Sequence, residues 1–221
     1  MAQRLPVRGG AHPLAQQVGD GSGHGDLLWS GALERYSSQV RSTSQQAVLD
    51  AALALVAEGG LDAVTIGALT ARSGVSNGSV YHHFGSRAGL LAVLYRESFA
   101  HCMAALVPAL EVGDARKAVR AVVARYLEWV ADHPGRAHFL YAAPESADPA
   151  VKLAAFRPVA RWFAARMAAG ELREVPLWAL DPVVMGPAHE CARRHLRHGF
   201  DLGPAVDLVA DAVWGAVAPV G

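Results

Sequence analysis

The chain has 221 residues, of which 52% are hydrophobic and 18% are charged, with 20 basic residues balanced by 20 acidic ones. The apolar content is ample for a buried core, which excludes disorder as the general condition of the chain. The charge balance excludes a global bias toward nucleic acid, a membrane surface or an acidic substrate, so any such partner must bind a local surface.

Cysteine usage and hydropathy point to the cytoplasm. Cys102 and Cys191 are far apart in the sequence and lack the spacing of a disulfide framework or of a four-cysteine zinc site. No run approaches the roughly 18 uninterrupted apolar residues of a membrane span, and the N-terminus lacks the apolar core of a signal peptide. We therefore expect a cytoplasmic protein with no membrane partner.

Residues 1–41 are predicted to form a flexible arm. They are rich in glycine, contain Pro6 and Pro13, and sustain neither helical nor strand periodicity. The segment from Leu27 to Tyr36 could form a helical turn that docks elsewhere, or it could be an extension with no role.

From Ser42 onward the sequence predicts one helix after another. The first begins at Ser42 or Thr43 and ends at Gly59-Gly60, where glycine can take a left-handed conformation. Capping residues, prolines and glycines divide the remainder into helices expected at residues 65–73, 76–83, 86–111, 115–132, 135–142, 148–169, 182–198 and 204–218. Pro158 and Gly186-Pro187 predict a kink or a late start within their helices. The expected fold is all-α, with about nine helices.

Residues 65–84 have the pattern of a helix-turn-helix motif. Thr65 can cap a short helix, Gly74-Val75-Ser76 provides a turn, and Ser76 can cap a second short helix. In such a motif the second helix enters the major groove of DNA and the first braces it from behind. Small polar residues at the start of the second helix let its backbone amides approach phosphate closely.

Eight residues are candidates for DNA contact. Asn77 and Ser79 can reach base edges, whereas Gly78 only permits close approach. Tyr81 and His82 offer phosphate a hydroxyl and an imidazole. The full set is Thr65, Ser76, Asn77, Gly78, Ser79, Tyr81, His82 and Arg87, the last supplying a cation. The competing interpretation is a helical hairpin that packs on the next domain, although exposed small polar residues serve packing poorly.

Several short motifs occur together between residues 45 and 95. They are Leu49-Asp50-Ala51-Ala52, Gly59-Gly60, Thr65, Gly74-Val75-Ser76, Gly78-Ser79-Val80-Tyr81-His82-His83-Phe84, Ser86-Arg87 and Leu90-Leu91. With them the segment resembles the DNA-binding domain of the TetR family of one-component transcriptional regulators. The resemblance implies an all-helical homodimer whose N-terminal domain binds a palindromic operator and whose C-terminal domain holds a small effector that releases the DNA.

The expected domains are the arm at 1–41, a helix-turn-helix DNA-binding domain at 42–88, and a ligand-binding and dimerisation domain at 89–221. By the same resemblance, the last two helices form a four-helix dimer interface with those of a second chain. The chain departs from the family in lacking a basic residue at Asn77 and an acidic one after Arg87, where Ala88-Gly89 stand.

The expected DNA-binding domain is formally neutral. Between Arg41 and Ala100 four arginines face four acidic residues: Arg41, Arg72, Arg87 and Arg96 against Asp50, Glu58, Asp62 and Glu97. Because affinity for DNA depends on neutralised phosphates, this predicts a shallow salt dependence unless the arm contributes Arg4, Arg8 and Arg35.

Aromatic and histidine residues spread over the middle helices suggest a mainly apolar effector pocket. The preferred lining residues are Trp129, His133, Tyr141, Trp162 and His189, which favour a mainly hydrophobic effector, aromatic compounds included. Any one of them taken alone fits an ordinary core position better.

A metal site is the alternative of a different class. Cys191, His195 and His198 share one helical face, but Arg193, Arg194 and Arg197 would repel a cation, so no metal and no cofactor is expected. The sequence also lacks the nucleophile, dinucleotide and phosphate-loop motifs of common enzymes. We therefore expect a repressor that is not an enzyme, the alternative being a helical metal- or small-molecule-binding protein with a vestigial helix-turn-helix.

Overall fold

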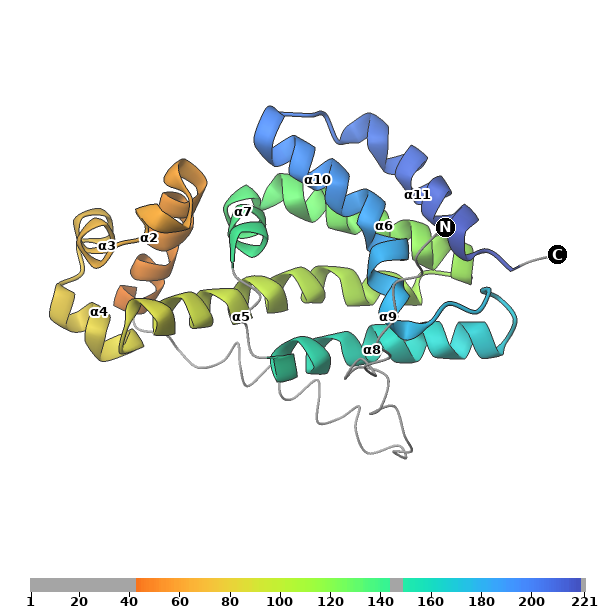
Figure 1. Cartoon of the computed structure of the whole chain (residues 1–221), viewed down its shortest axis with the longest axis horizontal. Coiled ribbons are helices and arrows are strands. Elements are labelled where there is room, and N and C mark those ends of the chain that lie inside the picture. The colour runs from red at the N-terminus through yellow and green to blue at the C-terminus, as the bar shows by residue number, and fades with distance from the viewer. Residues whose placement is uncertain (1–42, 144–148, 220–221) are drawn as a thin grey trace, which may run out of the picture.

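The computed structural model describes residues 43–143 and 149–219, and every regular element in these two ranges is helical. The expected arm, including the turn at Leu27 to Tyr36, lies outside the described residues. Figure 1 shows a small N-terminal unit at one end of an elongated molecule and a larger helical unit at the other. The helices are α2 (Thr43–Gly59), α3 (Ile66–Ser73), α4 (Asn77–Phe84), α5 (Arg87–Leu106), α6 (Ala115–Asp132), α7 (Pro134–Ala142), α8 (Pro149–Ala168), α9 (Leu177–Leu180), α10 (Gly186–His198) and α11 (Gly203–Val217).

The helix boundaries in the N-terminal unit follow from capping chemistry. The Thr65 hydroxyl accepts the Ala68 amide at 3.1 Å and begins α3. Gly74, at φ 70°, ends that helix in the left-handed conformation that glycine adopts without a Cβ clash. Ser86 begins α5 by accepting the Gly89 amide at 3.0 Å. The short helices predicted from the sequence therefore start and stop where their capping residues stand.

α5 belongs to two hydrophobic cores. Leu90, Leu94 and Tyr95 are buried in the core of the N-terminal unit, while Cys102 and Leu106 are buried in the C-terminal core. By length and composition Arg87–Glu111 is long and apolar enough to cross a membrane, but the core helix of a soluble protein can have the same length and composition. Its two buried faces are those of a connecting helix inside the fold.

α7 is the second element shared by the two units. Phe139, with 1% of its surface exposed, is buried in the N-terminal core among residues of α2 and α5. Two residues further on, Tyr141 packs against the C-terminal core. At the start of α7, Gly135 lies against the backbone of Leu53 in α2. The two units are thus joined by α5 and α7 together.

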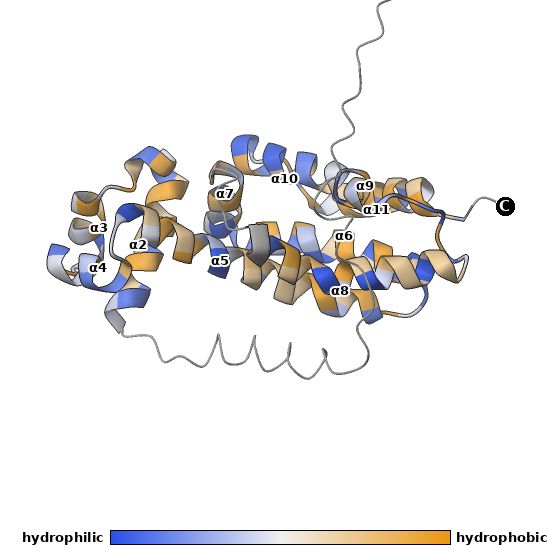
Figure 2. Cartoon of the chain, turned by 60° about the horizontal axis from the view of Figure 1, so that its bottom comes forward, coloured by the Kyte–Doolittle hydropathy of each residue, from blue (hydrophilic) through white to orange (hydrophobic). Residues whose placement is uncertain are grey.

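The C-terminal core is built around α6, which packs against α5, α10 and α11. Val119, Val123, Leu127 and Val130 recur along one face of α6 at helical spacing and are fully buried. α8 lies along α5 on the side away from α10 and α11 (Figure 1). Figure 2 shows that α10 is markedly more hydrophilic than α11, with which it pairs.

The all-α prediction is confirmed, with local differences at prolines. The helix expected at 86–111 ends at Leu106 and continues as a 3₁₀ segment, Val107–Glu111, which contains Pro108. The helix expected at 182–198 starts late, as predicted: a π-helical segment, Asp181–Met185, precedes α10. Proline removes a backbone donor and clashes with the preceding turn, so 3₁₀ and π-helical geometry replaces the regular α-helix in these two segments. α8 continues on both sides of Pro158.

Candidate DNA-binding interface

The predicted helix-turn-helix is formed by α3 and α4. Their inner faces contribute Leu69 and Val80, which are buried in the N-terminal core. A hydrogen bond of 3.1 Å between Ser44 and the His83 ring also ties the end of α4 to α2. α4 is thereby held in one orientation, with its opposite face in solvent.

The start of α4 has the small polar surface that the sequence predicts. Ser76 caps the helix by accepting the Ser79 amide at 3.2 Å, and its hydroxyl donates to that of Ser79 at 3.1 Å. Asn77 is exposed and its Oδ1 accepts the Thr70 hydroxyl at 2.6 Å, which leaves the amide NH₂ group as a donor on the outer surface. Gly78 is exposed, and a Cβ added there would meet nothing closer than the Ser76 hydroxyl at 4.0 Å.

Two larger polar side chains follow on the same exposed surface. Tyr81 has 51% of its surface exposed, and His82 is also exposed. An exposed tyrosine offers a partner both its hydroxyl group and the apolar surface of its ring. Thr65, also exposed, stands at the start of α3. The structure therefore places Thr65, Ser76, Asn77, Gly78, Tyr81 and His82 on the surface, with Ser79 half-buried among them.

Arg87 makes contacts that the sequence does not reveal. Its guanidinium donates to the Val64 carbonyl through Nε and to the Leu61 carbonyl through Nη2, both at 2.6 Å. Charge-assisted hydrogen bonds of this kind fix the turn after α2 against the start of α5. Contact of Arg87 with phosphate stays a prediction, beside this bracing role.

Arg72, a cation beside the motif, is neutralised by an ion pair. Arg72 at the end of α3 forms a two-bond ion pair with Glu58, at 2.6 and 2.7 Å. The hydrogen bonds from Arg72 hold the pKa of Glu58 below its ordinary value. With Arg72 paired and Arg87 bound to carbonyls, the geometry favours recognition by hydrogen bonds and close backbone approach over bulk electrostatic attraction.

Four of the five candidate effector residues fall into two polar clusters of the C-terminal unit. In the first, Tyr141 and His189 meet Tyr126. Both tyrosine hydroxyls lie 2.9 Å from His189 Nδ1 and 2.5 Å from each other. Burial raises the pKa of Tyr141 to about 12 and raises the pKa of Tyr126 as well. The cluster joins α6, α7 and α10.

The second cluster joins Trp129 and His133 to His101 on α5. The Trp129 indole donates to His101 Nδ1 at 2.9 Å, and the His101 and His133 rings lie 4.5 Å apart edge to face. Burial lowers the pKa of His101, with neighbouring Arg136 acting in the same direction. The rings of Tyr126 and Trp129 stack at 6.5 Å and so connect the two clusters.

Trp162, the fifth candidate, lies apart on α8. Its ring contacts that of Phe163 at 5.0 Å, and the Arg166 guanidinium lies 5.4 Å from its centroid. Its buried indole nitrogen has no hydrogen-bond partner among the described residues. The five candidates therefore do not surround one point; four belong to the linked clusters and Trp162 flanks the core at α8.

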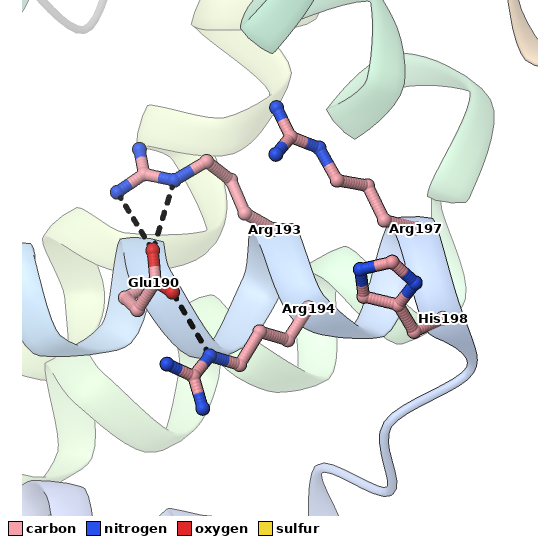
Figure 3. Close-up of a pocket in the computed structure, with 5 residues that line it drawn as sticks. All are labelled: Glu190, Arg193, Arg194, Arg197 and His198. Atoms are coloured by element: carbon pink, nitrogen blue, oxygen red, sulfur yellow. Dashed lines mark hydrogen bonds and ion pairs between the residues drawn. The ribbon is translucent and has the colours of Figure 1, made fainter.

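The metal alternative gains no support from the geometry. His195 Nδ1 lies 2.7 Å from the Phe200 carbonyl, and Cys191 is half-buried. Within residues 43–143 and 149–219, no three histidine, cysteine, aspartate or glutamate side chains gather as a metal site would require. Instead, the outer side of α10 has a groove of about 320 Å³ lined by Glu190, Arg193, Arg194, Arg197 and His198 (Figure 3).

Three features of these sites were not predicted from the sequence. Tyr126 and His101 complete the two clusters, but Tyr126 stands at an ordinary core position of α6 and His101 at an exposed position of α5, so periodicity alone gives no signal. The bonds of Arg87 to carbonyls depend on the path of the turn after α2, which local sequence does not fix.

Comparison with known proteins supports the interpretation of the motif. A family model described as bacterial regulatory proteins, tetR family, matches residues 48–94, which span α3, α4 and most of α2. No curated protein is similar enough in sequence to count as a relative.

Solved structures share the fold over most of the chain. A TetR family transcription regulator from Marinobacter aquaeolei VT8 is 19% identical, with a TM-score of 0.70, covering 85% of this chain and 99% of that one. The regulator FadR from Bacillus subtilis, in complex with stearoyl-CoA, is 16% identical, with a TM-score of 0.67 and coverage of 76% and 96%. The regulator PfmR from Thermus thermophilus is 20% identical, with a TM-score of 0.63 and coverage of 75% and 96%.

Proposed function

We propose that the chain is a member of the TetR family of bacterial regulatory proteins, which are transcription regulators and not enzymes. On this premise it is a repressor released from a palindromic operator by a small effector. The observation that carries the proposal is the start of α4, where Asn77, Gly78 and Tyr81 are exposed on a helix anchored from behind. We assign its site of action to the cytoplasm.

DNA contact is divided between base reading and phosphate binding. Asn77 is suited to adenine through its amide, and Ser79 reaches a neighbouring edge. Ser76 and Thr65 stand at helix starts near phosphate, where Tyr81, His82 and Arg87 add side-chain contacts. Gly78 lets the backbone of α4 lie close to the groove.

The proposed active form is a homodimer. A palindromic operator requires two copies of α4 related by a two-fold axis, about 34–36 Å apart, so that they enter successive major grooves. α10 and α11 supply the contact between chains. α11 supports this role, since Leu208 keeps 73% of its surface exposed and stands on the same outward face as Ala212.

The proposed effector is mainly hydrophobic and binds in the C-terminal unit. The aromatic side chains of Trp129 and Trp162 offer apolar surface, while Tyr141, His133 and His189 offer a few polar groups. Stearoyl-CoA in the Bacillus subtilis FadR structure makes long acyl chains suitable first probes, alongside aromatic compounds.

Release is proposed to occur by a shift of population between two arrangements of the dimer. Because α5 and α7 are buried in both cores, a ligand that moves them changes the separation of the two α4 helices. DNA affinity then falls by the ratio of the ligand's affinities for the two arrangements. Spin labels on the two α4 helices should report a changed separation when ligand binds; lost DNA binding at unchanged separation would contradict the mechanism.

Substitution of Tyr81 tests the assigned docking. Tyr81→Ala should weaken binding to all duplex sequences alike, whereas Asn77→Ala should change which sequence is preferred. Trp178→Ala is the matched control, because Trp178 is also an exposed aromatic residue but lies on α9, outside α4 and outside the helices of the proposed dimer contact. Fluorescence anisotropy with labelled duplexes measures both effects, and an unchanged affinity of the Tyr81 variant would show that the docking is wrong.

A further inference from the structure

The outer faces of α10 and α11 carry opposite charges. On α10, Arg194 keeps 63% of its side chain exposed and lines the groove with Arg197 (Figure 3). On α11, Asp207 and Asp211 keep 89% and 57% of their side chains exposed, although both contact Arg120. One protomer therefore presents a basic surface and an acidic surface on neighbouring helices.

The groove on α10 has more positive charge than its own carboxylate can balance. Glu190 accepts from Arg193 at 3.3 Å and from Arg194 at 2.9 Å, so one acidic group serves two guanidinium groups. No ion pair joins Arg197 or His198 to a carboxylate within the described ranges 43–143 and 149–219. A negatively charged surface placed against this groove would gain electrostatic energy without displacing an existing partner of Arg197.

The acidic edge of α11 has the opposite surplus. Asp207 and Asp211 share Arg120, and Arg116 comes no nearer to Asp211 than 3.9 Å. A carboxylate has several acceptor sites, so each aspartate can accept further donors while keeping its contact with Arg120. Between them on the helix stands Leu208, the most exposed large apolar residue described.

An apolar residue flanked by acidic groups fits a protein surface better than a small anion or a nucleic acid. The exposed Leu208 offers an apolar contact to a protein partner, and the flanking aspartates would repel phosphate. A second copy of the chain offers the basic groove that matches this acidic edge. In a two-fold dimer each such contact occurs twice, because the interface is isologous.

We propose that the α10 groove of one protomer receives the acidic edge of α11 from its partner, so that Arg194 and Arg197 pair with the partner's Asp207 and the partner's Asp211. Packing α10 against the partner's α10 would place arginine against arginine, and packing α11 against α11 would place aspartate against aspartate. Like-charge contact is costly, so charge selects the arrangement of α10 against α11. This inference rests on the proposed homodimer and adds the pairing that orients it.

Charge reversal in two complementary variants tests the pairing. The reversed-groove variant carries Arg194→Glu and Arg197→Glu, and the reversed-edge variant carries Asp207→Lys and Asp211→Lys. Each variant alone faces like charge in its own dimer. Sedimentation velocity of the full chain should show the dimer dissociation constant raised by about a hundredfold, which is about tenfold for each of two equivalent contacts.

Mixing the two variants is the decisive step. In the mixed dimer both contacts are again between opposite charges, so the mixture should form heterodimers with an affinity within about tenfold of the unmodified chain. Arg157→Glu, an exposed arginine on α8, is the control and should leave dimerisation unchanged. A mixture that stays monomeric, or reversed variants that dimerise normally, would overturn the pairing.

Two further readouts keep the outcomes separate. If the unmodified chain is monomeric at every concentration and salt, the homodimer of the proposed function fails together with the pairing. If it dimerises but mixing rescues nothing, only the pairing fails. If a reversed variant loses its helical circular dichroism signal, neutral variants replace the reversed ones: Arg194→Gln with Arg197→Gln, and Asp207→Asn with Asp211→Asn. Each neutral variant should abolish the salt dependence of dimerisation. Persistence of that salt dependence would refute the pairing.

Discussion

Phe139 provides a direct test of how the two units of the chain are joined. It stands on α7 but is buried, with 1% exposure, in the core formed by α2 to α5. Phe139→Ala removes the ring and leaves a cavity that packed neighbours can fill only in part. Substitutions of this kind cost about 3–5 kcal/mol, so the free energy of unfolding should fall by that amount.

Thermal and urea denaturation measure this loss. For a chain of this size, about 3–5 kcal/mol corresponds to a melting temperature lower by about 6–20 °C. Phe200→Ala makes the same chemical change at a residue that is 42% exposed, and should cost less than about 1 kcal/mol. A loss of similar size in both variants would refute the placement of α7 in the N-terminal core.

Three other substitutions test the local geometry. Gly89→Ala should destabilise the fold by about 1–3 kcal/mol in urea denaturation, because the added Cβ would overlap the Phe84 carbonyl oxygen; an unchanged midpoint would contradict that approach. Gly78→Ala, where the space is open, should instead stabilise α4 by up to about 1 kcal/mol while weakening DNA binding in anisotropy, and unchanged DNA affinity would show that close approach at Gly78 is not needed. Tyr141 has its pKa raised from 10.0 to about 12, so the neutral phenol is favoured by folding; its stabilising contribution, about 3 kcal/mol, is complete below pH 10 and is lost as the pH rises toward 12. The free energy of unfolding, measured in urea between pH 8 and 12, should therefore fall less steeply with pH for Tyr141→Phe than for the unmodified chain. An equal fall in both proteins would contradict the raised pKa of Tyr141.

Local sequence was sufficient for the motif because capping and burial patterns there act over a few residues. Thr65, Ser76 and Ser86 each accept the amide three residues later, as the sequence pattern requires. The expected helix periodicity likewise places Leu69 and Val80 in the core. The all-helical fold and its order of elements were predictable on the same grounds.

Long-range packing was not predictable in the same way. Phe139 looks like any apolar residue of a short helix, and nothing nearby in the sequence shows that it enters the core of the other unit. Tyr126 and Tyr141 are separated by 15 residues and meet His189 only because α6, α7 and α10 pack together. The sequence therefore identified four residues that the structure brings into two clusters. It did not identify Tyr126 and His101, which complete these clusters, because their contacts depend on tertiary structure.

The central claim is that α4 reads a palindromic DNA site, and selection of bound sequences from a random duplex pool tests it most directly. The selection uses the full chain at two salt concentrations. The account predicts one enriched palindrome whose half-sites lie about one helical turn apart, with an affinity that falls only modestly with salt because Arg72 is paired with Glu58 and the DNA-binding domain is formally neutral. No enriched sequence at either salt concentration would contradict the claim.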